Sequence, residues 1–115
     1  MAEQPSRATN RNSTQPKDIT RIAEEAVLTN LRIQGWKDAV LCDPNGREIQ
    51  AKNPGGGLQL FRVKTAVAPN TPDSLSDSER IVLISKAEGS GAVAYQAKVQ
   101  LDAKYAPARI QYNQL

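Results

Sequence analysis

The chain has 115 residues, a formal charge of +3 and a pI near 9.2, which is enough for one small, mildly basic domain. Hydrophobic residues make up 39% of it, below the about 45–50% of an average domain, so we expect a modest core. One cysteine and no histidine exclude an internal disulfide, a zinc site built on cysteine or histidine, and histidine-dependent nucleophilic catalysis. Any metal chemistry would use carboxylates and favour Mg²⁺ or Mn²⁺.

Residues 1–17 are polar, contain two prolines and carry the basic residues Arg7, Arg11 and Lys17. Such a composition buries too little apolar surface to offset the entropy of ordering, so it predicts a flexible basic arm ahead of a single α/β domain at 18–115. The arm could become ordered on nucleic acid or on a protein partner. No stretch approaches the ~18 apolar residues of a membrane span, and no signal peptide is recognisable. We therefore expect a cytoplasmic protein with no membrane partner.

The first predicted helix follows this arm. Asp18 can cap its N-terminus and Gly35 can end it. Between them, apolar side chains recur at helical spacing: Ile19, Ile22, Ala23, Ala26, Val27 and Leu31. Trp36 comes directly after the glycine and is expected to pack in the core, as are the three tyrosines of the later strands.

Three short strands are predicted next, at residues 38–42, 47–52 and 58–67. The segment Asp43 to Gly46 and the glycine-rich segment Asn53 to Gly57 are typical of tight turns. Consecutive strands joined by such short turns predict an antiparallel meander. Cys42, at the end of the first strand, is expected to be a small buried hydrophobe.

A capping box from Ser76 to Glu79 predicts the start of a second helix, which ends before the glycines at 89–91. Ile81 and Ile84 are expected to face the core, with Leu83 as a further candidate. Residues 92–101 form a further strand, and 108–115 offer a last short one. This order predicts an α/β fold in which two helices cover one mixed sheet.

The predicted order resembles the PD-(D/E)xK nuclease-like superfamily, which includes restriction endonucleases and Holliday-junction resolvases. Gly46-Arg47-Glu48-Ile49-Gln50 is similar to the G-x-E-I-D pattern of resolvase-like members. Phe61-Arg62-Val63-Lys64-Thr65 is similar to their strand ending E/Q-V-K-T, and the resemblance extends from about Ile19 to Leu101. It implies a core of helix, three-stranded antiparallel meander, helix and one or two further strands in a mixed central sheet.

The resemblance also implies a set of site residues. Lys64 matches the catalytic lysine, and Glu25 (or Glu24) matches the glutamate of the first helix. Gln50 stands where the family has its metal-binding aspartate, and Arg62 stands where it has the second acid. A neutral amide is a poor Mg²⁺ ligand and an arginine repels the ion, so the resemblance implies a degenerate metal site without a cofactor.

An active Mg²⁺-dependent endonuclease with a shifted acidic ligand is an alternative, in which Lys64 and Glu25 would be catalytic. Asp43 and Glu48 are the acids that could replace the missing ligands. However, Asp43 lies in a predicted turn, and we expect Glu48 on the sheet face opposite Gln50. We therefore favour a protein that is not an enzyme.

The leading hypothesis is a nucleic-acid-binding protein with an inactive nuclease-like core and DNA as its partner. Its phosphate contacts are predicted at these basic residues: Arg62, Lys64, Lys52, Arg7, Arg11 and Lys17. An arginine in place of a metal ion can hold a phosphate directly with two hydrogen bonds. A simpler interpretation makes Arg62 and Lys64 surface residues that pair with acids of the first helix, Glu24 or Glu25. A further alternative is a structural or assembly protein, such as a phage component or complex subunit, whose arm and open sheet edge contact a protein partner or a second copy.

Overall fold

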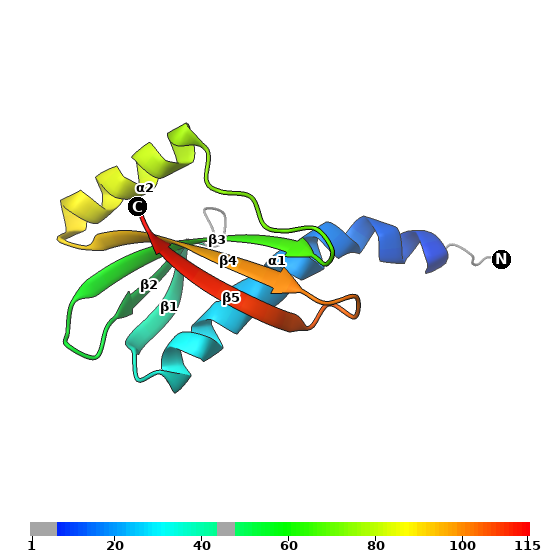
Figure 1. Cartoon of the computed structure of the whole chain (residues 1–115), viewed down its shortest axis with the longest axis horizontal. Coiled ribbons are helices and arrows are strands. Elements are labelled where there is room, and N and C mark those ends of the chain that lie inside the picture. The colour runs from blue at the N-terminus through cyan, green and yellow to red at the C-terminus, as the bar shows by residue number, and fades with distance from the viewer. Residues whose placement is uncertain (1–6, 44–47) are drawn as a thin grey trace.

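The computed structural model describes the backbone of residues 7–43 and 48–115, and side chains at 19–42 and 48–115 (Figure 1). The described residues form two helices and one five-stranded sheet. The elements are α1 (Arg7–Ile33), β1 (Lys37–Asp43), β2 (Glu48–Lys52), β3 (Leu58–Val67), α2 (Asp77–Ser90), β4 (Val93–Leu101) and β5 (Pro107–Gln114). The predicted α/β class is confirmed.

The sheet has the strand order β1-β2-β3-β4-β5, so each strand pairs with its neighbours in sequence. Strands β1, β2 and β3 form the predicted antiparallel meander. Helix α2 then carries the chain across to β4, which runs parallel to β3, and β5 returns antiparallel to β4. The result is the mixed sheet that the sequence predicts, with β1 and β5 at its edges.

Helix α1 begins at Arg7, where the sequence predicts a flexible arm, so the backbone of residues 7–17 is helical. Extending a helix that is already formed costs much less than starting one, which explains how a polar stretch can continue it. The helix ends at Ile33, and Gly35, the glycine predicted to stop it, follows with a φ of 89° that suits glycine. There the Trp36 N–H donates to the Leu31 carbonyl at 3.0 Å. The division into an arm and a domain stays a prediction.

The larger core lies between α1 and one face of the sheet. Ala23, Val27 and Leu31 of α1 are buried against Ile49, Phe61 and Val99 of the strands. Phe61 is the centre of an aromatic cluster, with ring centroids 5.5 Å from those of Trp36 and Tyr95 and 5.6 Å from that of Tyr112. The packing roles predicted for the tryptophan and the tyrosines are confirmed.

A smaller core lies between α2 and the opposite face of the sheet, where Leu83 and Ala87 are buried against Leu60 and Ala94. The prediction that Ile81 faces the core is wrong, because its side chain is 64% exposed. It lies two residues from Leu83, about 200° around the helix, so both cannot face the sheet. The prediction of a buried Cys42 is also wrong, since it is exposed near the end of edge strand β1.

Within the described part of the chain, neither helix has the length and apolar character needed to cross a membrane.

Candidate nucleic-acid interface

Strand β3 presents its two basic residues to the α2 side of the sheet. Successive strand residues alternate between the faces, so Phe61 and Val63 enter the α1 core while Arg62 and Lys64 point the other way. Their side chains are only 24% and 31% exposed. The pair therefore occupies a partly enclosed position at the N-terminal end of α2.

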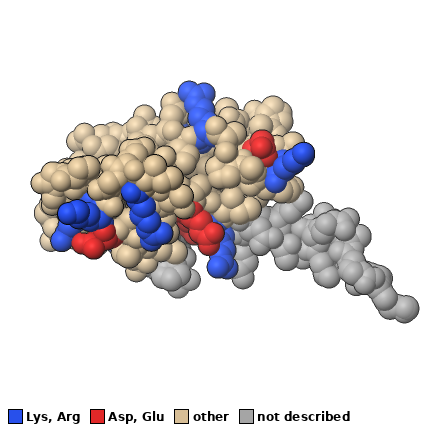
Figure 2. Space-filling view, turned by 90° about the horizontal axis from the view of Figure 1, so that it is seen from below, with Lys and Arg blue, Asp and Glu red and all other residues tan. Residues whose placement is uncertain are grey.

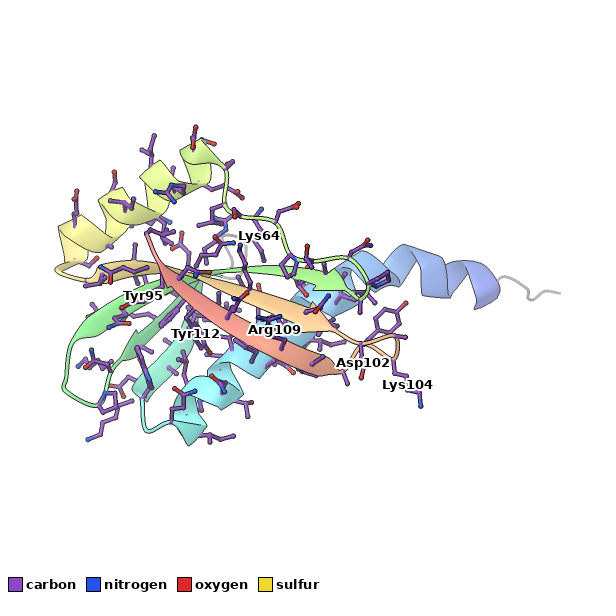
Figure 3. All side chains as sticks on the ribbon, viewed as in Figure 1. Lys64, Tyr95, Asp102, Lys104, Arg109 and Tyr112 are labelled. Carbon is purple, nitrogen blue, oxygen red and sulfur yellow. The ribbon has the colours of Figure 1, made fainter. Side chains whose placement is uncertain are left out.

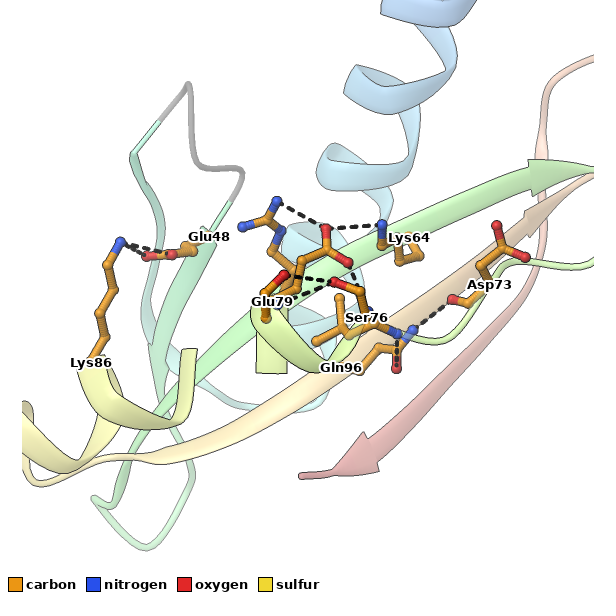
Figure 4. Close-up of polar contacts among 10 residues, drawn as sticks. Glu48, Lys64, Asp73, Ser76, Glu79, Lys86 and Gln96 are labelled. Carbon is orange, nitrogen blue, oxygen red and sulfur yellow. Dashed lines mark hydrogen bonds and ion pairs between the residues drawn. The ribbon is translucent and has the colours of Figure 1, made fainter. Parts of the chain in front are cut away.

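Glu79 of α2 contacts both cations (Figure 4). Its Oε2 lies 3.1 Å from the Lys64 Nζ and 3.4 Å from the Arg62 Nη2. Its Oε1 accepts a hydrogen bond of 2.9 Å from the Ser76 N–H, and the Glu79 N–H donates to the Ser76 Oγ at 3.2 Å. This is the predicted capping box, and it holds one carboxylate between the helix terminus and the basic strand.

These contacts lower the pKa of Glu79 from 4.5 to about 2. The hydrogen bond from the Ser76 backbone is the largest cause, followed by the one from Lys64. Glu79 is thus an anion at every physiological pH. It supplies one negative charge to two positive ones, so the group keeps one net positive charge.

The predicted pairing of Arg62 and Lys64 with Glu24 or Glu25 is wrong, because α1 packs on the opposite face of the sheet. Glu25 is exposed and accepts a hydrogen bond of 3.1 Å from the Arg21 Nε. Glu24 is buried within the α1 side. The structure therefore does not bring Glu25 together with Lys64, the other residue that the resemblance places in a catalytic site.

Glu48 lies directly across from Arg62 in the register of β2 and β3, and Gln50 lies across from Leu60. The expectation that Glu48 and Gln50 point to opposite faces is wrong, since residues two apart on a strand share a face. Glu48 is buried, and its carboxylate accepts hydrogen bonds of 2.9 and 3.1 Å from the Lys86 Nζ. The acid nearest in register to Arg62 is thus already paired with a cation from α2.

The described side chains on this face do not provide a set of ligands for a divalent metal ion. Among the side chains that the structure describes, no group of three or more acidic, histidine or cysteine residues is placed to hold one. Glu48 pairs with Lys86, and Glu79 pairs with Arg62 and Lys64, so both nearby carboxylates already have cationic partners. Asp43, the other acid considered as a ligand, has its side chain outside the described residues.

The remaining predicted contact residues lie away from Lys64. Lys52 points to the α2 side of the sheet as well, but its register partner on β3 is Leu58. Leu58 and Lys64 are six residues apart on the strand, so Lys52 lies about 20 Å along the strand direction from Lys64. Its Nζ lies 3.8 Å from the Asp38 Oδ2. Arg7, Arg11 and Lys17 belong to the first turns of α1, and their side chains are outside the described residues.

Two cations on this face were missed by the sequence reasoning. In the register of the sheet, Lys98 on β4 lies beside Lys64, and Arg109 on β5 lies beside Gln100. Figure 3 labels Lys64 and Arg109. The alternation of Gln96, Lys98 and Gln100 is the signal that could have revealed them. By contrast, the view in Figure 2 shows scattered basic side chains, some beside acidic ones, and no single basic surface.

The order and the pairing of the elements are those of the PD-(D/E)xK nuclease-like fold. Among solved structures the chain is similar to the Holliday junction resolvase of Archaeoglobus fulgidus, an archaeal hyperthermophile. The TM-score is 0.58 and the identity 23%, over 79% of this chain and 72% of the resolvase. No family model matches the sequence, and no curated protein matches it. At this identity the likeness establishes the fold.

Proposed function

We propose that the chain is a nucleic-acid-binding protein that uses a nuclease-like core to hold DNA phosphates without cutting them. The observation that carries the proposal is Arg62 beside Lys64, two half-buried cations on the strand where nucleases of this fold bind a metal ion. One protein of similar fold is a Holliday junction resolvase, which makes DNA the natural partner to test first.

The geometry supports direct phosphate binding at this position. The guanidinium of Arg62 and the ammonium of Lys64 already converge on one anionic oxygen, the Oε2 of Glu79. A phosphate oxygen has the same charge and accepts the same hydrogen bonds. Glu79 therefore occupies the place that a phosphate would take, and binding would exchange one anion for another.

Fluorescence anisotropy with duplex, branched and single-stranded DNA at two salt concentrations tests the proposal. We expect affinity to fall steeply with salt, and Arg62→Ala to reduce the slope of log affinity against log salt by about 1. Glu79→Gln should raise the affinity, because it removes the competing charge. Arg21→Ala is the matched control, since Arg21 is an exposed, ion-paired arginine on the α1 side.

Binding that is insensitive to salt, or no binding to any of the three substrates, would contradict the proposal. The same preparations should be incubated with plasmid and Mg²⁺ or Mn²⁺. We expect the wild-type protein to leave the plasmid uncut. Plasmid cleavage by the wild type that is lost in Lys64→Ala would establish the active-nuclease alternative instead.

An assembly component is the second candidate, and one observation favours it. An open surface groove of about 430 Å³ lies between α1 and the edge strand β5, with the apolar side chains of Ile22, Ile33 and Ile110 in its wall. Ile33 is 78% exposed there. Size-exclusion chromatography with light scattering separates the two: a defined oligomer without DNA affinity would favour assembly.

A further inference from the structure

A second cationic position lies on the α2 side of the sheet, beyond the N-terminus of α2. A hollow of about 160 Å³ is lined by Thr71 and Pro72 of the β3–α2 loop and by Lys98, Gln100, Arg109 and Gln111 of β4 and β5. At about 30 Å³ per water molecule, it has room for roughly five waters, enough for a phosphate group. Its lining combines two cations with a hydroxyl and two amides, all of which can donate hydrogen bonds.

The two cations of this hollow differ from the others on the same face because no described carboxylate pairs with them. Arg62 and Lys64 share Glu79, and Lys86 binds Glu48. Lys98 donates to a neutral hydroxyl, the Ser74 Oγ, at 3.1 Å. Arg109 makes no ion pair with any residue that the structure describes. Two uncompensated positive charges facing one small polar hollow attract an anion.

The wall of the hollow is held in place by strand β4. Three residues of β4, each two positions apart, donate side-chain hydrogen bonds to the β3–α2 loop. Gln96 donates to the Asp73 carbonyl at 2.8 Å, Lys98 to Ser74, and Gln100 to the Asn70 carbonyl at 2.7 Å. Because the loop is fixed before a ligand arrives, binding costs little ordering entropy.

The register of the sheet sets the two cations next to each other. Lys98 lies across from Gln111, and Gln100 lies across from Arg109, so all four side chains point to the same face. Lys64 is the register neighbour of Lys98 on the other side. Lys64 reaches toward Glu79 and Lys98 toward Ser74, so these two ammonium groups diverge into separate positions.

We infer that Lys98, Arg109 and Thr71 form a phosphate-binding site separate from the Arg62–Lys64 position. The guanidinium of Arg109 binds two phosphate oxygens, the ammonium of Lys98 supplies a second charge, and the Thr71 hydroxyl donates from the loop. The site itself does not depend on the proposed function. Its use as a second backbone contact for DNA rests on that function.

Amide NMR titration with inorganic phosphate at low ionic strength tests the site without any nucleic acid. We expect shifts at Thr71, Lys98 and Arg109, and an affinity about tenfold weaker in Arg109→Gln, because a hydrogen bond to a charged group is lost. Lys104→Gln is the matched control: it removes the same charge from an exposed residue at the β4–β5 turn (Figure 3). It should change the affinity by less than about twofold.

Two results would overturn the site. One is an absence of shifts at these residues, and the other is an equal effect of Arg109→Gln and Lys104→Gln. Arg109→Lys separates charge from geometry, since it keeps the charge but loses the paired hydrogen bonds, and we expect intermediate affinity. Unfolding temperatures should match across the variants, because Arg109 and Lys104 are both exposed.

A parallel titration with a short duplex identifies the source of the phosphate. If Arg109→Gln weakens both phosphate and duplex binding, the site contacts a nucleic-acid backbone. If it weakens phosphate binding alone while the duplex still binds through Arg62, the site takes small phosphate compounds, and its role as a DNA contact is overturned. Failure of DNA binding in all variants, with phosphate binding intact, contradicts the proposed function and leaves this site standing.

Discussion

Glu79→Gln separates the two roles of the carboxylate that joins α2 to β3. Glutamine can still accept the hydrogen bond from the Ser76 N–H, so the cap of the helix is largely kept. The negative charge toward Lys64 and Arg62 is lost. The substitution therefore isolates the charge contribution, whereas Glu79→Ala removes the cap as well.

The magnitude follows from the pKa of Glu79, which is about 2 instead of 4.5. Taken at face value, this difference corresponds to at most about 3 kcal/mol of folding free energy at neutral pH. The carboxylate is a quarter exposed, so solvent screening reduces its real contribution. Part of the remainder is the hydrogen bond that glutamine keeps. We expect Glu79→Gln to lower the free energy of unfolding by about 1 kcal/mol at pH 7, and Glu79→Ala to lower it by about 1 kcal/mol more.

The dependence on pH provides the sharper test. The pKa is lowered by folding, so the stabilisation is fully present above pH 4.5 and is lost as the pH falls toward 2. The free energies of unfolding of wild type and Glu79→Gln should be measured in urea between pH 7 and pH 2.5. The difference between the two proteins should be constant near neutral pH and should narrow as the pH falls toward 2.5. A difference of the same size at pH 3 and pH 7 would refute the assignment of the effect to charge.

Three further predictions concern packing and burial. Leu83→Ala should lower the free energy of unfolding by about 2–5 kcal/mol and Ile81→Ala by less than about 0.5, as measured by urea unfolding, because Leu83 is buried and Ile81 is exposed. Lys86→Gln should lower the free energy of unfolding in urea by about 1–3 kcal/mol at pH 7, because it removes the ion pair of the buried Glu48. In a Glu48→Gln background the same substitution should lower it clearly less. Burial raises the pKa of Tyr112 to about 12, so the ultraviolet absorbance of its phenol should change near pH 12. The free energy of unfolding should fall as the pH rises from about 10 to 12. A Tyr112 phenol that ionises near pH 10 would contradict the raised pKa.

The fold could be predicted from the sequence because its signals are local. The tight turn after β2, the capping box at Ser76 and the glycine after α1 each fix one boundary without reference to distant residues. The start of α1 could not be predicted in this way. It depends on continuing a helix already formed rather than on the preferences of residues 7–17.

The electrostatics of the site could be predicted only in part. Period-two alternation correctly places Arg62 and Lys64 on one face. Their partner could not be found, because Glu79 reaches them only when the α2 crossover sets the helix N-terminus over β3. Glu79 had already been explained by its cap, and nothing in the sequence shows that one carboxylate serves both purposes. Arg109 was missed for a similar reason, since only the pairing of β5 with β4 places it next to Gln100 and Lys98.

Under the proposed function, the distribution of charge on the α2 side indicates where a nucleic acid would lie. Beside the N-terminal end of α2, Arg62 and Lys64 of β3 share the single carboxylate of Glu79, and Lys86 of α2 pairs with Glu48, so one of these three positive charges is left uncompensated. On β4 and β5, Lys98 and Arg109 have no described carboxylate partner, so the uncompensated charge is displaced toward the sheet edge. A phosphate backbone would meet these cations first and would have to displace Glu79 to reach Arg62. Removing Arg109 should therefore slow the association of DNA, whereas removing Arg62 should mainly speed its dissociation, and stopped-flow kinetics would distinguish the two.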